Sequence, residues 1–371
     1  MDFTYNDEQR MLTDSVRKLV SDAWTFEARR ARASTAGLDR TAWGALAELG
    51  VAGLLVPQEY DGFGESPATL IAVQFELGRG LVSAPVIPSA VIATTLLAHC
   101  GNPAAQSERL PAMATGEDVT VVAWLEPGQR DAVRPQNTLA HASATGYVLS
   151  GKKHLVWSGG AADHFLVTAL LEGDLAVFQV PAAAAGVTVD DYPTMDRYRC
   201  ASVSFNAVAL PATALVVQGE HAESALGLAL DYGVTAVCAH AAGAMERLVE
   251  ITSDYLKTRR QFGRPLADFQ VLQHRLADML LHKELAASMA YVAAVGLAET
   301  DPAERQRLVS SAKVAAGDAG RYVGENAVQL HGGIGVTDEL EVGDYFKRLI
   351  YTDYLLGSAD FHLSRLETLL V

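Results

Sequence analysis

Arginine and aromatic residues gather near residue 260 in a short stretch that has the chemistry to bind a phosphorylated ligand. The stretch reads Arg-Arg-Gln-Phe-Gly-Arg-Pro-Leu-Ala-Asp-Phe-Gln over residues 259–270. A planar guanidinium group, such as that of Arg259, binds two phosphate oxygens at once. The ring of Phe262 offers a flat surface to a nucleotide. These residues therefore predict a site for a dianionic phosphate.

Helices on both sides must position this stretch. Apolar residues at helical spacing predict a helix that enters it from about Met245. Gly263 and Pro265 are expected to end that helix, because glycine admits positive φ and proline lacks an N–H group. A second helix follows with one apolar stripe: Phe269, Leu272, Leu276, Met279 and Leu280. The alternative is an ordinary helical hairpin whose arginines are solvated and favoured by the helix dipole.

A glycine-rich segment is the second place where a ligand could lie against the backbone. It reads Gln-Leu-His-Gly-Gly-Ile-Gly over residues 329–335 and follows a helix predicted over 305–328. Adjacent glycines let backbone N–H groups approach a ligand closely. The alternative is a plain helix C-cap and turn.

Together the two segments resemble the signature of the acyl-CoA dehydrogenase family, Arg-x-x-Phe-Gly-x-Pro-Leu-x-x-Phe-Gln with Gln-x-x-Gly-Gly-x-Gly. In that family both segments serve the FAD of a neighbouring subunit. The resemblance implies that the diphosphate and adenosine end of FAD is held by six residues here: Arg259, Phe262, Gln270, Gln329, Gly332 and Gly333.

The resemblance fails at the catalytic base, which must remove the α-proton while the β-hydride passes to the flavin. The family's base is usually the Glu of a Tyr-Glu-Gly-Thr segment, but residues 354–358 read Tyr-Leu-Leu-Gly-Ser and place Leu356 there. Some members carry the base in the first helix of the C-terminal bundle, and counting back from Arg259 that position is Gly233. Neither side chain can take a proton, so no catalytic residue is predicted.

Asp231 is the carboxylate nearest to that second position. Two residues correspond to about 200° around a helix, so Asp231 should point away from where Gly233 points. It is interpreted as a solvated acid or a CoA contact, with a replacement base as the alternative. Glu246 and Glu250, further along the helix, are predicted to be surface charges.

The family's contacts to the flavin ring are altered as well. The usual Thr-Glu-Pro-x-x-Gly-Ser-Asp segment reads Leu-Glu-Pro-Gly-Gln-Arg-Asp over residues 125–131, one residue shorter and without the Gly-Ser pair. The family's second ring contact, Lys-x-Trp-Ile-Thr-Asn, reads Lys-His-Leu-Val-Trp-Ser over residues 153–158. Leu155 therefore replaces the Trp that stacks on the flavin, and Trp157 replaces the small hydroxyl residue. Trp157 either fills the seat of the ring or is a core aromatic of the β domain.

Composition narrows the class of protein. The net charge of −15 argues against nucleic acid or an anionic membrane as the main partner. Cys100, Cys200 and Cys238 have no metal-type spacing, so reduced thiols and no metal site are predicted. The acidic N-terminus is not a signal peptide, and no apolar run is judged long enough to span a bilayer. A soluble cytoplasmic protein is expected.

The predicted fold class is α+β, with three domains. Residues 1–118 form an N-terminal helical domain, 119–219 a small β domain, and 220–371 a C-terminal bundle of the four-helix type, which is the family's order. The predicted helices of the first domain are 7–24, 41–50 (with Thr41 as N-cap), 67–80, 87–100 and 104–114. The predicted strands are 119–125, 147–149, 154–158, 164–170, 175–180, 187–190 and 201–205. Asp61 stands where the family usually has a glycine.

The two segments that would bind a neighbouring subunit's FAD are intact, whereas the base positions and the flavin-ring contacts are altered. This combination favours a non-catalytic subunit of a heteromeric acyl-CoA dehydrogenase. Resemblance to the family's α2β2 enzymes of steroid side-chain degradation implies several partners: a second acyl-CoA dehydrogenase subunit, an acyl-CoA substrate and an electron-accepting flavoprotein. One alternative is a complete homotetrameric enzyme with Asp231 as its base. The other is a flavin-free scaffold or acyl-CoA-binding protein that keeps only the fold.

Overall fold

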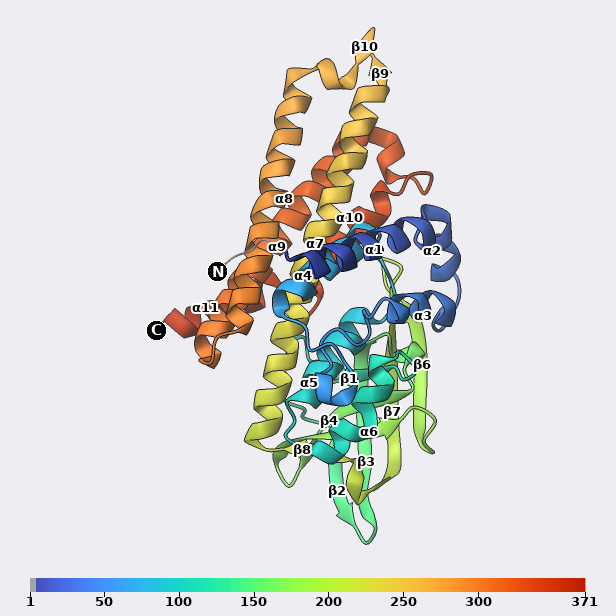
Figure 1. Ribbon diagram of the computed structural model, residues 1–371, viewed down its shortest axis with the longest axis vertical. Helices are drawn as coiled ribbons and strands as arrows, with labels where there is room; N and C mark the ends of the chain where they lie inside the picture. Colours follow the sequence, from blue (N-terminus) through green and yellow to red (C-terminus); the bar gives the residue numbers. More distant parts are fainter. Residues whose placement is uncertain (1–4, 132, 371) are drawn as a thin grey trace.

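The computed structural model of the protein describes residues 5–131 and 133–370 and has an α+β fold (Figure 1). Short helices lie across the middle of the molecule, the sheet lies below them, and long helices rise above and beside them. The N-terminal elements are α1 (Asp7–Ala23), α2 (Phe26–Ala33), α3 (Arg40–Glu48), η1 (Gln58–Tyr60), α4 (Pro67–Arg79), η2 (Val86–Ala93), α5 (Thr94–Ala98) and α6 (Pro103–Ala114).

Local sequence explains most of these helices. The predicted N-cap of α3 is wrong: Asp39, not Thr41, accepts the free N–H groups of Thr41 and Ala42, so the helix begins at Arg40. The single helix predicted over 87–100 is a π-helix, η2, that continues into α5. Asp61 adopts a left-handed conformation with φ 64°, the conformation that a glycine adopts most easily.

The sheet has eight strands: β1 (Thr120–Ala123), β2 (Leu139–Ser143), β3 (Gly146–Trp157), β4 (His164–Leu171), β5 (Asp174–Pro181), β6 (Val187–Pro193), β7 (Arg199–Pro211) and β8 (Leu215–Gln218). Their order is β6-β7-β3-β2-β4-β5-β8, with β1 beside β4. β4 pairs in parallel with β1 and β2, and the other pairs are antiparallel. The strands predicted over 147–149 and 154–158 are one strand, β3, with a register shift between Lys153 and Val156.

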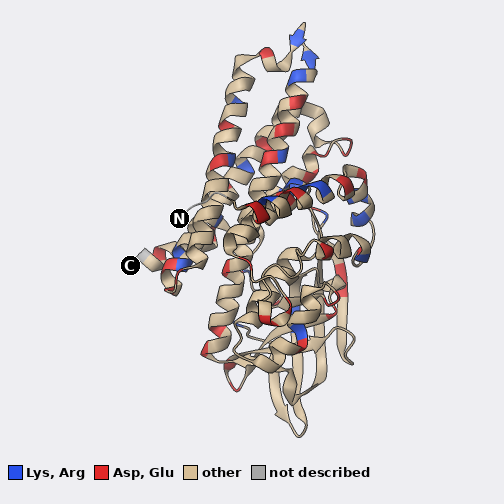
Figure 2. Ribbon diagram, viewed as in Figure 1, with Lys and Arg blue, Asp and Glu red and all other residues tan. Residues whose placement is uncertain are grey.

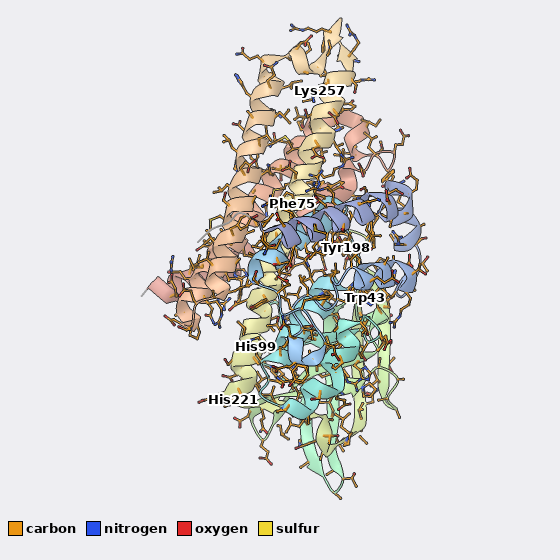
Figure 3. All side chains as sticks on the ribbon, viewed as in Figure 1. Trp43, Phe75, His99, Tyr198, His221 and Lys257 are labelled. Carbon is orange, nitrogen blue, oxygen red and sulfur yellow. The ribbon has the colours of Figure 1, made fainter. Side chains whose placement is uncertain are left out.

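The C-terminal part contains α7 (Glu220–Thr258), α8 (Gln270–Leu297), α9 (Pro302–His331), η6 (Gly332–Val336), α10 (Val342–Tyr354) and α11 (Ala359–Leu370). Between α7 and α8 lie β9 (Arg260–Gln261), β10 (Arg264–Pro265) and η5 (Leu266–Asp268). α7 is one continuous helix, with His221 and Lys257 near its two ends (Figure 3). It ends at Thr258, before Gly263, because Arg259 is already extended. Phe269 precedes α8 instead of lying inside it.

α7 crosses α4 at very short distance through two glycines. A Cβ atom on Gly78 would lie 2.0 Å from the carbonyl oxygen of His240, and one on Gly243 would lie 1.9 Å from that of Phe75. By length and composition alone α7 could cross a membrane, but 78% of its most apolar window is buried inside the protein. It is therefore a core helix, and α4, α8 and α9 pack against it.

One continuous apolar core joins the N-terminal helices, the sheet and the first half of α7, with Leu46, Phe165 and Leu226 fully buried. A second core lies inside the upper bundle. Cys100, Cys200 and Cys238 are buried free thiols. The boundaries predicted at 118/119 and 219/220 stay a prediction, although the eight-stranded sheet lies between Thr120 and Gln218.

Candidate functional site

The arginine stretch forms a small hairpin at the tip of the molecule, where Lys and Arg residues gather (Figure 2). Strands β9 and β10 pair Gln261 with Arg264, and the turn between them uses positive φ at both Phe262 and Gly263. The ring of Phe262 is 88% exposed and meets Phe269 edge to face at 6.1 Å. The guanidinium group of Arg264 lies 4.1 Å over the ring of Phe269. The exposed ring of Phe262 therefore lies beside a half-buried ring, Phe269, that carries a cation over its face.

Arg259 itself is exposed, and no carboxylate of the described chain pairs with it. The side chain of the nearby Arg260 donates to the carbonyl oxygen of Gly263, at 3.4 Å. Gln270 is also exposed, at the first position of α8. Guanidinium groups without protein acceptors remain available to an external oxyanion.

The glycine segment lies against the end of α7. α9 ends at His331, and Gly332 takes φ 65°. Neither Gly332 nor Gly333 has a heavy atom of the described residues within 4 Å of where a Cβ would be. The rings of His331 and Tyr255 stack at 4.4 Å, and the Tyr255 hydroxyl donates to the His331 carbonyl oxygen at 3.3 Å. This contact ties the glycine segment to the last turn of α7, just before Arg259, and Gln329 is exposed two residues before His331.

Gly233 and Leu356, the two positions where the sequence resemblance predicts a base, lie side by side. A Cβ on Gly233 would lie 2.9 Å from Cδ1 of Leu356 and 2.8 Å from Cδ1 of Ile92 on η2. Leu356 therefore occupies the space beside Gly233 with an aliphatic group. A cavity of about 200 Å³ opens beside Leu356, lined also by Trp124, Asp231 and Arg365.

Buried polar groups hold the segment that carries Leu356. The Lys313 ammonium group, fully buried in α9, donates to the carbonyl oxygens of Gly357 at 2.7 Å and Asp353 at 3.1 Å. The ring of His362 on α11 lies with Nε2 3.0 Å from the Leu356 carbonyl oxygen. Burial lowers the pKa of Lys313, and burial together with that ammonium group lowers the pKa of His362 to about 3. The segment keeps a defined position although it lacks a carboxylate.

Asp231 is not solvated, which corrects one interpretation of the sequence. It is 1% exposed, and its carboxylate receives Nε of Arg305 at 2.9 Å and two nitrogens of Arg365 at 3.4 Å. Burial raises the pKa of Asp231, and Arg365 and Arg305 partly oppose this. The arginines come from α9 and α11, so sequence near Asp231 carried no sign of them.

The charges of Glu246 and Glu250 are also paired rather than free. Glu246 receives the ammonium group of Lys283, which is buried, at 2.6 Å. Glu250 receives Arg79 of α4 at 2.9 Å. Both carboxylates link α7 to neighbouring helices.

Glu126 fixes the loop between β1 and β2, one wall of the 200 Å³ cavity. Burial alone would raise its pKa, but hydrogen bonds from Thr138, Asn137 and Gln136 bring the pKa down to about 2. The buried ammonium group of Lys153 lies 3.3 Å away, and burial lowers the pKa of Lys153 to about 8. Both groups stabilise the shortened loop instead of facing the cavity.

Trp157 is 6% exposed and belongs to the main core. The guanidinium group of Arg348, on α10, lies 5.5 Å from its ring and 3.9 Å from the ring of Tyr198, which lies centrally in Figure 3. Arg348 is fully buried and pairs with Asp196 at 2.8 Å. Trp157 is thus a core aromatic that also ties the sheet to α10. Leu155 is 39% exposed at the irregular part of β3.

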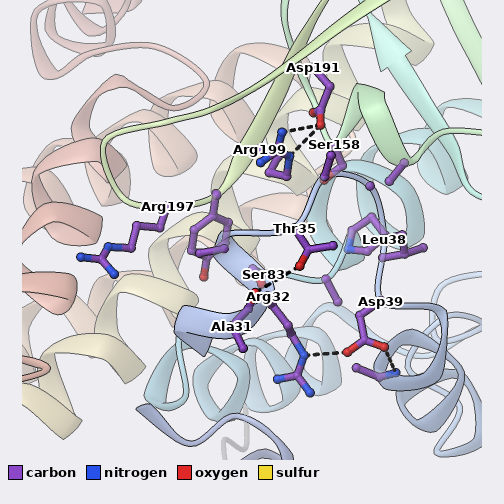
Figure 4. Close-up of a pocket in the computed structure, with 18 of the residues that line it drawn as sticks. Ala31, Arg32, Thr35, Leu38, Asp39, Ser83, Ser158, Asp191, Arg197 and Arg199 are labelled. Carbon is purple, nitrogen blue, oxygen red and sulfur yellow. Dashed lines mark hydrogen bonds and ion pairs between the residues drawn. The ribbon is translucent and has the colours of Figure 1, made fainter. Parts of the chain in front are cut away.

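A separate cavity of about 380 Å³ lies between the α2–α3 connection and the strand ends around Ser158 (Figure 4). Two ion pairs stand on its walls, Arg199 with Asp191 at 2.7 Å and Arg32 with Asp39 at 2.8 Å. It shares no lining residue with the cavity beside Leu356. No local sequence pattern marks this cavity, because its walls come from distant segments of the chain.

Comparison with known proteins agrees with this architecture. Residues 6–117 match the acyl-CoA dehydrogenase N-terminal domain, and residues 224–368 match the C-terminal domain. Acyl-CoA dehydrogenase FadE27 of Mycobacterium tuberculosis is 30% identical over 99% of this chain and 98% of its own. Acyl-CoA dehydrogenase IpdE2 of the same organism is 32% identical over 98% of this chain and 97% of its own.

Two solved structures are similar to this chain along nearly its whole length. The ChsE4-ChsE5 complex of Mycobacterium tuberculosis has a TM-score of 0.90 and 29% identity, covering 100% of this chain and 99% of the matched one. A variant of the Tcur3481-Tcur3483 steroid ACAD has a TM-score of 0.88 and 31% identity, covering 98% of both. The chain therefore belongs to the acyl-CoA dehydrogenase family, a family of oxidoreductases whose cofactor is FAD.

Proposed function

We propose that this chain is the non-catalytic subunit of a heteromeric acyl-CoA dehydrogenase and completes the FAD site of its partner. The observation that carries the proposal is the contact between Gly233 and Leu356. Both positions at which the family places its base lack a carboxylate, and the aliphatic side chain at one fills the space beside the other. An α-proton brought beside these two residues would meet no carboxylate on either of them.

The outward segments suit the diphosphate and adenosine parts of FAD. Arg259 has no acceptor among the described residues, Phe262 presents its ring to solvent, and the space above Gly332 and Gly333 is open. Gln270 and Gln329 stand exposed on the same two segments. When bound, FAD supplies the hydride acceptor for the β-carbon. This chain's part is to bind and orient the diphosphate.

The residues at the expected flavin-ring site of this chain also support a non-catalytic role. Trp157 stands where the family places a small hydroxyl residue, and it is packed against Arg348. Leu155 offers no aromatic face for stacking. A ring seated in this chain's own β domain would have to displace a buried indole.

The partner that we propose is a second acyl-CoA dehydrogenase subunit in an α2β2 assembly, because similar chains occur in the ChsE4-ChsE5 complex and in Tcur3481-Tcur3483. The name of the latter favours a bulky, steroid-like acyl-CoA as substrate. The assembly would form the trans-2-enoyl-CoA, pass electrons to an acceptor flavoprotein and work in the cytoplasm.

The test is flavin absorbance per chain, measured for this chain alone and after co-expression with an acyl-CoA dehydrogenase encoded beside it. We expect no flavin in the first sample and FAD with activity in the second. Arg259→Ala should lower the FAD content of the complex at least tenfold, because a charge-assisted bond to phosphate is lost. Arg307→Ala, which removes a partly exposed arginine whose ion-pair partner among the described residues is Glu304, is the matched control.

A yellow, active homo-oligomer of this chain alone would contradict the proposal. It would favour a complete enzyme that uses Asp231, since Asp231 lines the same cavity as Leu356. In that case Asp231→Asn would abolish turnover and retain FAD. In the proposed heteromer Asp231→Asn leaves chemistry at the partner's base unchanged, because Asp231 here serves two arginines.

A further inference from the structure

Residues 338–344, which lead from the glycine segment into α10, are held by arginines from three other parts of the chain. These arginines come from α2, from α7 and from the turn between β6 and β7. The ion pairs are Asp338–Arg197 at 2.8 Å, Asp338–Arg30 at 3.4 Å, Glu341–Arg29 at 2.7 Å, Glu341–Arg247 at 3.6 Å and Asp344–Arg197 at 3.4 Å.

Arg197 bridges the two ends of this stretch. Its Nη2 reaches Asp338, which precedes α10, and its Nε reaches Asp344, which lies in the first turn of α10 and is buried. In Figure 4 the Arg197 side chain points away from Ser158 and Arg199. Its guanidinium group therefore serves residues 338–344 and not the 380 Å³ cavity that it borders.

The backbone of Arg197 is strained, because its φ of 66° is a left-handed conformation that costs free energy for any residue with a side chain. The turn that imposes this conformation is well fixed. The Arg197 N–H donates to the Thr194 carbonyl oxygen at 2.9 Å, and the Thr194 N–H donates to that of Tyr198 at 2.8 Å. Asp196 in the same turn pairs with the fully buried Arg348. Glycine would avoid the strain, so the guanidinium group is the reason to look for a role here.

The stretch that Arg197 holds lies directly against the glycine segment. Thr337 donates to the Ile334 carbonyl oxygen twice, through its hydroxyl at 2.9 Å and its N–H at 3.2 Å. A Cβ on Gly343 would lie 3.8 Å from the Gly335 carbonyl oxygen, so the start of α10 touches the end of the segment. Glycine loses more conformational freedom than other residues when it is ordered. Fixing one end of the segment beforehand lowers the cost of ordering it around a ligand.

We propose that Arg197 is a positioning residue for the glycine segment. By holding Asp338 and Asp344 it keeps the segment in the shape that receives the diphosphate and adenosine part of the partner's FAD. Arg197 acts through residues 338–344 and has no contact with FAD itself. This inference rests on the proposed function, in which the glycine segment binds FAD.

The test is the dissociation constant of FAD from the co-expressed complex, measured by serial dilution with bound and free flavin distinguished by fluorescence anisotropy. Arg197→Gly removes the guanidinium group and the backbone strain together, and should weaken FAD binding about threefold to tenfold. Saturating FAD should restore turnover, because the reacting groups belong to the partner. Asp344→Asn should weaken FAD binding when introduced alone and add nothing to Arg197→Gly, since both changes break the same pair.

Glu172→Gly is the matched control. Glu172 is exposed in the turn between β4 and β5 and has a φ of 55°, so this change relieves the same kind of strain and should leave FAD affinity unchanged. A wild-type complex without FAD would contradict the proposed function. FAD in the wild-type complex, with equal affinity in Arg197→Gly and Glu172→Gly, would overturn this inference alone. Turnover that saturating FAD does not restore would also overturn it, because the damage would then extend beyond FAD binding.

Discussion

Single side chains decide what the 200 Å³ cavity can do, and most of them come from outside the segments that the sequence marks. Leu356 and Gly233 were identifiable by counting along the chain. Asp231 was misjudged, because Arg305 and Arg365 lie 74 and 134 residues away and no local pattern points to them. A residue type can be read locally, whereas its burial depends on which helices finally surround it.

The titration of His362 predicts a pH dependence of the unfolding free energy. Its folded pKa of about 3 lies below the ordinary value of about 6.5, so between these pH values only the unfolded state binds the proton. Stability therefore rises with pH across that window and is lost on acidification. His362→Gln should flatten the slope of unfolding free energy against pH, by up to about 1.4 kcal/mol per pH unit.

Chemical denaturation at a series of pH values measures that slope. His274→Gln, at an exposed position on α8, is the control and should keep the wild-type slope. An unchanged slope in His362→Gln would show that other groups cause the acid sensitivity.

Whole elements followed from sequence where most of their positions are apolar and buried, as in α4 and β5. The missed elements lack such a buried apolar run. α2 reads Phe-Glu-Ala-Arg-Arg-Ala-Arg-Ala, and β2 is exposed at four of its five positions. They are held by partners, β2 by its ladder with β3 and α2 by the pairs of Arg29 and Arg32. Tertiary context is what creates them.

The close crossing of α4 and α7 predicts how glycine substitutions in α7 change the free energy of unfolding. Gly243→Ala places a methyl group against the backbone carbonyl of Phe75, which cannot rotate away. We expect a loss of about 3 kcal/mol in unfolding free energy, although alanine normally favours a helix. Gly227→Ala lies on the same helix with nothing within 4 Å, and should gain about 0.5–1 kcal/mol. Urea unfolding compares the two, and equal effects would exclude a close helix contact.

The molecule as a whole carries an apolar face that its own core does not use. On α8, along the outer edge of the bundle in Figure 1, Val271, Leu281 and Leu285 are 63%, 68% and 54% exposed. The sequence stripe predicted there correctly included Met279, which is buried, but wrongly included Leu280, which is 42% exposed. α8 is apolar on more than one side, as expected of a helix at a subunit interface.

The exposed apolar residues of α8 are predicted to be needed for assembly of the complex. Leu281→Glu combined with Leu285→Glu should prevent the co-expressed complex from forming, because two charges would be buried without partners. Light scattering after size exclusion measures the mass, and circular dichroism confirms that the chain stays folded. Met11→Glu, on α1 and 70% exposed, should leave the complex intact. A complex of unchanged mass with both Leu281 and Leu285 replaced would place the interface elsewhere.

The contact between residues 233 and 356 also limits any attempt to give this chain a carboxylate at either position. With Cδ1 of Leu356 only 2.9 Å from where a Cβ at position 233 would sit, the two positions compete for one volume. A designer can install glutamate at 356 while retaining the glycine, or install it at 233 after trimming both Leu356 and Ile92. Glutamate cannot be installed at both positions together, because the two side chains would occupy the same space. The position of the added carboxylate must therefore be decided first, and an acyl group within its reach is chosen afterwards.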